Sequence, residues 1–412
     1  MSKIEKLIKE LCPNGIIFKT IGEICETITD YVAAGSFKDL SNNVKYLKEP
    51  DYAMLIRTTD IKSNFKGDKF IYINEAAFNY LWRVNLDKES IVLPNIGNCG
   101  EVYYLTPNDL PYKRCALATN SILVRSNQVN MKYLKYIFLA KDFQTQLKKI
   151  ISPSGQTKFN KTDLKKLKIP VPPLEVQEEI VRILDKFGEL EAELETELEA
   201  RRGQYEFWRN KLIDKTGQKY KLNEISKVYD GVHSTPNYQT AGVPFISVEN
   251  INDIYNSNKF ITKEDFSKYK IKPIINDVFM TRIGNIGKCS VFEKQIDLAY
   301  YVSLALIRPN IYIVNSKYLK HYLESSIGQE ELHKKTLVHA VPIKINKDDI
   351  GKINVLVPSL QEQERIVEIL DKFDKLVNDI SEGLPAEIEA RRKQYEYYRN
   401  KLLSFEELVV NG

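Results

Sequence analysis

Residues 173–187 read PLEVQEEIVRILDKF, and this stretch decides the fold because the chain repeats it. The second copy, SLQEQERIVEILDKF, occupies residues 359–373, 186 positions later. A shorter repeat, Glu-Ala-Arg-Arg, follows at 199–202 and again at 389–392. Repeats of this length indicate a duplicated architecture, here a long helix that alternates with globular modules.

The repeated stretch has the pattern of an amphipathic helix that continues to Ile213. Apolar or amphipathic residues recur about every 3.6 positions, the period of a helix with one persistent stripe. A lone helix of this length is marginally stable, so we expect the two copies to pack antiparallel as a coiled coil. The side chains predicted at that interface are Leu184, Phe187, Leu194, Leu198, Tyr205, Trp208, Leu370, Phe373, Tyr395 and Tyr398.

The two copies differ in length. Between the repeated segments the distal copy has four additional residues, in the part that contains Gly383 and Pro385. Four residues are about one helical turn. We therefore predict a kink or a looped-out turn there, beyond which the apolar stripe realigns.

The modules before each helix also correspond. Gly97–Gly100 matches Gly284–Gly287, and Asn130–Lys135 matches Asn315–Lys320. Short β-prone runs separated by turns, followed by a helix over about 130–150, predict an α+β fold: two β-rich domains alternating with two long helices. The predicted divisions are 1–168, 169–215, 216–352 and 353–412.

Charge is segregated along the chain. The two modules carry net charges of +9 and +5, whereas the two helical segments carry −5 and −4, which together give +5. Basic modules that alternate with acidic helices place any attraction for nucleic acid on the modules.

The sequence argues against catalysis or metal binding by this chain. Its five cysteines form no CxxC pair, and its four histidines all lie in the second module, in no metal-ligand spacing. The segment 282–288 evokes a P-loop, but Arg282 replaces the first glycine and Cys289 replaces the magnesium-binding Ser or Thr. We predict no catalytic residue, no bound metal and no cofactor. The absence of a signal peptide or a long apolar run favours a cytoplasmic protein.

Loops that differ between the modules carry the side chains suited to DNA. Hydrogen-bonding side chains read base edges, while nearby cations hold phosphates. The paired glycine segments are predicted to be tight turns between strands, since Asn and Gly tolerate positive φ. The alternative is a turn whose amides contact a DNA phosphate. The predicted DNA-binding residues are Tyr31, Ser36, Phe37, Lys38, Arg57, Thr59 and Asn98 in the first module, and His233, Ser234, Thr235, Tyr238, Arg282, Asn285 and Lys288 in the second.

The chain resembles the DNA specificity subunit of type I restriction-modification systems. The resemblance rests on PPLEVQEEI at 172–180, PSLQEQERI at 358–366 and EARRKQYEYYR at 389–399. It implies two target recognition domains that read the halves of a split double-stranded DNA sequence, with the helices setting the gap. It also implies two modification subunits that bind S-adenosylmethionine and methylate adenine, and restriction subunits that use ATP and magnesium.

Two other functions remain open from the residues alone. One is a stand-alone DNA methyltransferase or nuclease, which requires cofactor motifs that the sequence lacks. The other is a coiled-coil scaffold whose basic modules bind RNA or protein. S-adenosylmethionine binding by the isolated chain would favour the first, and failure to bind any bipartite duplex would favour the second.

The helix length generates a first prediction. Insertion of one turn between 189 and 199 lengthens the helix by about 6 Å. The gap between the recognised half-sites should then grow by one or two base pairs, at about 3.4 Å each. Methylome sequencing measures that gap directly. An unchanged gap would mean that the looped turn of the distal copy absorbs the insertion.

Overall fold

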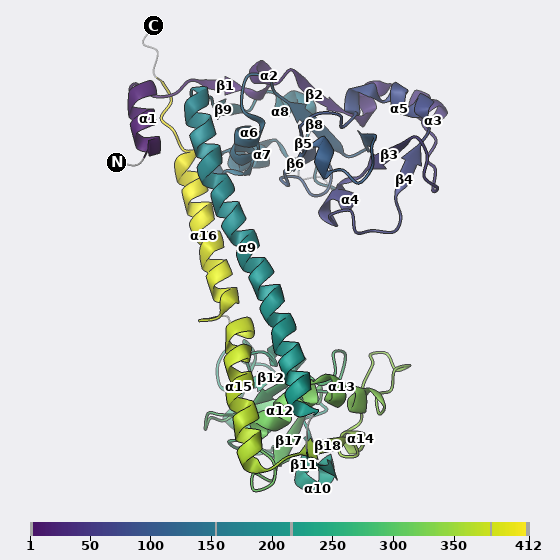
Figure 1. Cartoon of the computed structure of the whole chain (residues 1–412), viewed down its shortest axis with the longest axis vertical. Helices are drawn as coiled ribbons and strands as arrows, with labels where there is room; N and C mark the ends of the chain where they lie inside the picture. The colour runs from purple at the N-terminus through teal and green to yellow at the C-terminus, as the bar shows by residue number, and fades with distance from the viewer. Residues whose placement is uncertain (1–2, 153–154, 215–216, 380, 409–412) are drawn as a thin grey trace. The chain divides into compact units, whose positions relative to one another are not determined.

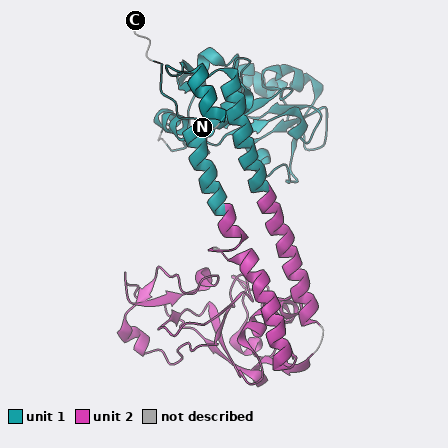
Figure 2. Cartoon of the chain, turned by 60° about the vertical axis from the view of Figure 1, so that its left-hand side comes forward, with its two compact units in different colours: residues 1–192, 389–412 teal, residues 193–388 magenta. Residues whose placement is uncertain are grey.

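The computed structural model describes residues 3–152, 155–214, 217–379 and 381–408. The chain divides into two compact units, one made of residues 1–192 and 389–412 and the other of residues 193–388 (Figure 2). The first unit is therefore assembled from both ends of the chain. No helix among the described residues is both long and apolar enough to cross a membrane.

The first unit contains three sheets and a helical layer (Figure 1). A four-stranded antiparallel sheet has the order β2–β8–β5–β6, and a three-stranded sheet has the order β4–β3–β7 with β3 and β7 parallel. Strand β1 pairs with β9, so the end of the module returns to its start. The strands are β1 (Phe18–Thr20), β2 (Thr27–Asp30), β3 (Ala53–Ile56), β4 (Ile71–Ile73), β5 (Ser90–Pro94), β6 (Tyr103–Leu105), β7 (Cys115–Leu117), β8 (Ser121–Arg125) and β9 (Lys168–Pro170).

Short helices connect and cover these strands. The expected helix over 130–150 is two helices, because the chain turns at Ala140. The helices are α1 (Lys3–Leu11), α2 (Ile21–Ile24), η1 (Tyr31–Ala34), α3 (Phe37–Asn43), α4 (Thr58–Lys62), α5 (Glu75–Tyr80), η2 (Trp82–Val84), η3 (Pro107–Asp109), α6 (Met131–Leu139), α7 (Lys141–Ile150) and α8 (Lys161–Leu164).

The second unit repeats the same topology. Its sheets have the orders β11–β17–β14–β15 and β13–β12–β16, again with one parallel pair, and β10 pairs with β18. The predicted duplication is thereby confirmed at the level of strand order. The elements are β10 (Gln218–Lys221), α10 (Leu222–Ile225), β11 (Ser226–Asp230), β12 (Val243–Ile246), η4 (Val248–Asn250), β13 (Phe260–Ile261), α11 (Lys263–Ser267), β14 (Val278–Thr281), β15 (Cys289–Val291), β16 (Ala299–Tyr300), β17 (Leu304–Pro309), α12 (Ser316–Glu324), α13 (Ser326–His333), α14 (Lys347–Ile350) and β18 (Asn354–Val357).

The central repeat forms one continuous helix, α9 (Leu174–Ile213), of 40 residues. Within the first unit, α16 (Leu384–Leu402) runs antiparallel to it. Phe187 stacks on Tyr398 with ring centroids 5.6 Å apart, and further along α9 the carboxylate of Glu191 accepts from Arg392 at 2.6 Å. Within the second unit, Tyr205 stacks on Phe373 at 6.5 Å. The expected helix pairing is confirmed.

Most of the predicted interface side chains are withdrawn from solvent. Leu184, Tyr205 and Leu370 are buried, while Phe187, Leu194, Leu198, Phe373 and Tyr395 are half-buried. Tyr398 and Trp208 remain 37% and 38% exposed. Tyr398 nevertheless stacks on Phe187 of α9, whereas Trp208 is a correction, because its ring packs against Phe207 and Lys211 of its own helix.

The distal repeat is interrupted as predicted. Five residues separate the end of helix α15 (Leu360–Asn378) from the start of α16 at Leu384. The carboxylate of Asp379 accepts from the backbone N–H groups of Ser381 and Glu382, which stabilises the turn. A Cβ atom on Gly383 would lie 2.6 Å from the carbonyl oxygen of Lys375, so no other residue fits there without displacement. Pro385 falls in the first turn of α16, where a missing N–H costs no helical hydrogen bond.

Each module is fixed to its following helix by a buried glutamine. Gln177 accepts a hydrogen bond from the backbone N–H of Asn130 at 2.9 Å and donates to the carbonyl of Pro172 at 2.8 Å. Gln363 accepts from Asn315 N at 2.7 Å and donates to Pro358 O at 2.8 Å. Both amides thus join the N-cap residue of a module helix, α6 or α12, to the chain just before α9 or α15. We call these contacts the glutamine clamps.

An aspartate eight positions after each clamp glutamine makes a second set of contacts between the module and the long helix. Asp185 accepts from Lys132 at 2.6 Å and from Tyr136, and Asp371 accepts from Lys317 at 3.1 Å. Burial by itself would raise both pKa values, but the hydrogen bonds and the nearby lysines hold the pKa of each aspartate below its usual range. Their stabilisation is present above the unfolded-state pKa and is lost as the pH falls through the lower folded-state value.

The clamp predicts a large effect of one substitution. Gln363→Ala leaves the N–H of Asn315 and the carbonyl of Pro358 without their partner, and an unsatisfied buried group costs about 1–3 kcal/mol. We expect guanidinium denaturation to show this loss in the transition of the second unit. Glu364→Ala, on the exposed neighbouring position, is the control and should change stability by less than about 0.5 kcal/mol. Equal effects of the two substitutions would contradict the role of the clamp.

Candidate nucleic-acid interface

The loop after β2 presents an exposed aromatic and a cation. Ser36 caps α3, since its hydroxyl accepts from the N–H of Asp39 at 3.2 Å. This cap places Phe37 at the first helical position, where its side chain is 82% exposed. Lys38 follows, exposed and without an ion pair within the described part of the chain. Such an arrangement offers a ring for stacking and a charge for phosphate.

Tyr31 is a correction to the predicted site. Its ring is only 5% exposed and lies in the core beneath the three-stranded sheet, with its hydroxyl 3.4 Å from that of Tyr46. A Cβ atom on the neighbouring Gly35 would lie 2.4 Å from the hydroxyl of Tyr80, so a larger residue there would displace that side chain. Tyr31 and Gly35 therefore shape the loop, and Phe37 and Lys38 are its accessible residues.

Arg57 is largely committed to its own module. Its guanidinium binds Asp60 through two nitrogens and donates to the carbonyl of Lys69 at 2.7 Å. The hydrogen bonds with Asp60 raise the pKa of Arg57. Thr59 and Asn98 are exposed, in α4 and in the glycine turn respectively. The accessible polar groups here are thus Thr59 and Asn98.

The paired glycine segments are tight turns. Gly97 and Gly100 have φ values of 85° and 106°, and Gly284 and Gly287 have 76° and 89°. The N–H of Gly97 donates to Thr157 O at 2.8 Å, and that of Gly284 donates to Ile343 O at 2.8 Å. These two amides are therefore occupied within the protein. The exposed side chains of Asn98, Asn285 and Lys288 are the parts of the turns that can contact DNA.

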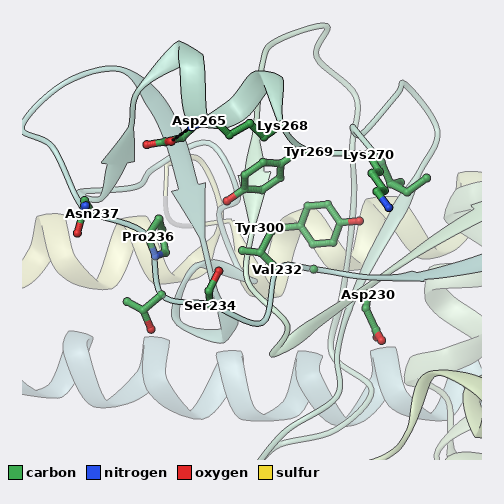
Figure 3. A pocket seen from close by; sticks show the side chains of 13 residues that line it. Asp230, Val232, Ser234, Pro236, Asn237, Asp265, Lys268, Tyr269, Lys270 and Tyr300 are labelled. Atoms are coloured by element: carbon green, nitrogen blue, oxygen red, sulfur yellow. Dashed lines mark hydrogen bonds and ion pairs between the residues drawn. The ribbon is translucent and has the colours of Figure 1, made fainter.

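In the second module, the loop after β11 borders a pocket of about 620 Å³. Figure 3 shows Ser234 and Tyr269 directed into it from opposite sides. Lys268 is paired with Asp265 at 2.9 Å, whereas Lys270 has no ion pair in the described regions. Burial raises the pKa of Tyr269 to about 12, so its hydroxyl stays protonated and can donate. The buried hydroxyl of Tyr300 lacks a protein partner among the described residues.

The other predicted residues of this loop are accessible. His233 is exposed with its Nε2 3.8 Å from a carboxylate oxygen of Asp230, and Ser234 and Thr235 are exposed beside the pocket. Tyr238 is 43% exposed and packs edge-on against Phe245 at 5.6 Å. The arrangement combines hydroxyl, imidazole and ring contacts on one loop.

Arg282 is a second correction. Its side chain is 8% exposed, its Nε donates to Ile345 O at 3.1 Å, and its guanidinium pairs with Asp230. Because its guanidinium is buried and paired with Asp230, Arg282 stabilises the loop and is not available to bind a phosphate. Lys268, Tyr269 and Lys270 line the same pocket but were not among the predicted DNA-binding residues. Their alternation of cation and aromatic ring is a sequence signal of nucleic-acid binding that could have identified them.

The described residues offer no catalytic constellation. His321 is fully buried between the hydroxyl of Tyr205, 3.1 Å away, and Asp371, 2.8 Å away. Burial raises the pKa of Cys25 and Cys115 to about 12, which keeps both thiols protonated. No group of three His, Cys, Asp or Glu side chains within the described ranges could hold a metal ion.

The family model of the type I restriction modification DNA specificity domain matches the chain twice, over residues 13–200 and 215–390. The chain belongs to this family. Each match contains one module and the greater part of the helix that follows it, so the two specificity domains coincide with the two repeats. The resemblance seen in the sequence is confirmed.

Named relatives agree with this assignment. The EcoR124I/EcoR124II type I restriction enzyme specificity subunit of Escherichia coli is 36% identical over 260 residues, 58% of this chain and 63% of that protein. A putative type I restriction enzyme specificity subunit of Haemophilus influenzae is 34% identical over 266 residues, 61% of this chain and 67% of that protein. The alignments thus span about two thirds of each relative.

Solved structures share the fold over nearly the whole chain. The type I restriction-modification S subunit of M. genitalium matches with a TM-score of 0.52 at 15% identity, covering 94% of this chain and 96% of that chain. A chain from a structure titled for complex assembly and conformational transition of the type I R-M system matches with a TM-score of 0.59 at 16% identity. The match covers 95% of this chain and 98% of that chain.

The geometry of the specificity domains generates a third prediction. Lys38→Ala removes one exposed cation from the first domain. Duplex DNA binding by the purified chain should weaken about equally for all sequences, and the slope of log K against log salt should fall by about one. Anisotropy titrations at several salt concentrations measure both quantities. Lys9→Ala removes the same charge from α1 and is the control, and equal slopes for the two variants would exclude Lys38 from the interface.

Proposed function

We propose that this chain reads a bipartite duplex DNA sequence and directs adenine methylation and restriction by partner subunits. The observation that carries the proposal is the occurrence of two specificity domains with one strand order and different exposed loops. A shared scaffold with different loops suits two half-sites of different sequence. Target recognition domains at 1–168 and 216–352, joined by the helices at 169–215 and 353–412, are part of this proposal.

Base contacts come, in this proposal, from the loops that differ between domains. Phe37, Lys38, Thr59 and Asn98 serve the first half-site. His233, Ser234, Thr235 and Tyr238 serve the second, with the pocket between Ser234 and Tyr269 accepting a base edge or a phosphate. The net positive charge of each module supplies the sequence-independent attraction to phosphates.

Duplicated aromatic surfaces support two copies of one partner. In the second unit, Phe207 and Trp208 lie edge to face at 5.6 Å, with Lys211 above Trp208 at 4.8 Å. In the first unit, 190 positions later in the sequence, Tyr397 and Tyr398 lie edge to face at 5.3 Å. Exposed aromatic clusters are typical centres of protein interfaces. Two equivalent clusters fit two modification subunits, one on each unit.

The chemistry belongs to the partners. S-adenosylmethionine is bound by the modification subunits, and ATP with magnesium by restriction subunits that can join them. This chain supplies sequence recognition and docking surfaces, and it acts where chromosomal DNA is exposed to the partners, in the cytoplasm.

Exchange of a domain tests the function. Replacing residues 14–150 by the corresponding segment of another specificity subunit, co-expressed with the modification subunit, should change one half of the methylated motif and leave the other half and the gap intact. Methylome sequencing reports the exchanged half of the motif, the other half and the length of the gap. A change in both halves would contradict modular reading, and the absence of any bipartite motif would favour the scaffold function. S-adenosylmethionine binding by the purified chain alone would favour the enzyme.

A further inference from the structure

Residues 337–344 form a closed loop on the second unit, which we call the finger. The N–H of Leu337 donates to the carbonyl of Lys344 at 2.8 Å, and that of Ala340 donates to Leu337 O at 3.1 Å. These bonds close the loop at its base. The finger is thus a loop whose backbone conformation is held by its own hydrogen bonds.

Apolar side chains dominate the surface of the finger. Val341 is 100% exposed, and the three other large apolar side chains, Leu337, Val338 and Ile343, are each more than 40% exposed. Single exposed apolar residues are ordinary, but four on one short loop indicate a binding surface.

The base of the finger is anchored beside the loop that carries His233 and Ser234. Gly284 donates to Ile343 O at 2.8 Å, and Arg282 donates through Nε to Ile345 O at 3.1 Å. The same guanidinium pairs with Asp230, the last residue of β11, where that loop begins. One buried arginine therefore connects the finger to the proposed base-reading loop.

Exposed cations lie at the base of the finger and on the neighbouring glycine turn. Lys344 pairs with Leu337 at the base, Lys335 comes two positions before Leu337, and Lys288 follows the turn whose Gly284 donates to Ile343. Lys288, Lys335 and Lys344 are exposed, and none has an ion pair within the described residues. Lys334, in contrast, is paired with Glu330 and Glu331. Unpaired lysines at the base of an apolar tip match a duplex, in which the charged phosphates flank the stacked bases. They would be a poor match for an apolar protein groove, where each uncompensated charge is costly to bury.

The corresponding segment of the first module has a different sequence. The segment that precedes Lys158 reads Ser-Pro-Ser-Gly-Gln-Thr at 152–157, where the finger has Val-His-Ala-Val-Pro-Ile. Thr157 O accepts from Gly97 N at 2.8 Å, as Ile343 O does from Gly284. The apolar sequence of the finger is therefore not repeated in the corresponding segment of the first module.

We propose that the finger is an apolar wedge for DNA. The tip formed by Val341 and Pro342 enters between two adjacent base pairs at the second half-site and unstacks them, while Lys288, Lys335 and Lys344 hold the flanking phosphates. Apolar wedges of this kind kink a duplex from the minor groove. The inference rests on the proposed function and adds that the second half-site is recognised partly through its deformability.

Base stacking at the second half-site tests the wedge. The probe is a duplex with the bipartite sequence obtained from the methylome, carrying 2-aminopurine at successive positions through and beside the second half-site, with the full chain and its modification subunit. Fluorescence should rise several-fold at one step with the native chain and with Val341→Leu. Val341→Ser should return it to the level of free duplex and weaken binding by about ten-fold. Because Val341 is fully exposed, both variants should fold.

Controls separate the alternatives. Gln156→Ser, at an exposed position of the corresponding segment of the first module, should leave the signal of the second half-site unchanged. A native complex that methylates the duplex without any unstacking would overturn the wedge and leave the proposed function intact. Loss of the modification subunit from Val341→Ser with unchanged stacking would make the finger a protein-docking element instead. If no bipartite motif exists at all, both the wedge and the proposed function fail.

Discussion

The two glutamine clamps are the contacts on which the rest of each unit depends. A glutamine amide has both donors and acceptors, so Gln177 and Gln363 can each bind the start of a module helix and the approach to a long helix at once. Because the amides are buried, either loss leaves polar groups unsatisfied. The clamp thereby sets the direction of each module helix against the long helix in the same unit, and side chains of the sheet, the module helix and the long helix share one core.

A second set of contacts makes each unit depend on both repeats. The carboxamide oxygen of Asn400 accepts from the N–H of Lys141, at 3.1 Å, and that of Asn210 accepts from Ser326 N at 2.9 Å. In both cases the end of one long-helix repeat caps a helix, α7 or α13, of the module that belongs to the other repeat. Residues far apart in the chain therefore share one core, and the first unit needs the C-terminal helix to be complete.

On this common frame the modules vary by local substitution. Asp30 at the end of β2 pairs with Lys161 at 2.7 Å, whereas Asp230 at the end of β11 pairs with Arg282. Likewise Tyr136 binds Asp185 where His321 binds Asp371. The carboxylates are retained and their partners change, so the frame tolerates new neighbours while the loops above it diverge. A family that must read many DNA sequences with one architecture requires this separation.

The sequence alone determined the architecture, because repetition and helical periodicity are local patterns that survive without coordinates. It predicted the duplication, the long helix that ends at Ile213, the break near Gly383 and the β-rich character of both modules. It also identified exposed loop residues such as Phe37 and Ser234. Only the tertiary structure decided burial: Tyr31 and Arg282 have the right chemistry for DNA but lie in the protein, and Trp208 has the right period for the helix pair but faces solvent. Side-chain type is a property of the chain, whereas accessibility depends on residues brought from elsewhere, such as Tyr46, Asp230 and Ile345.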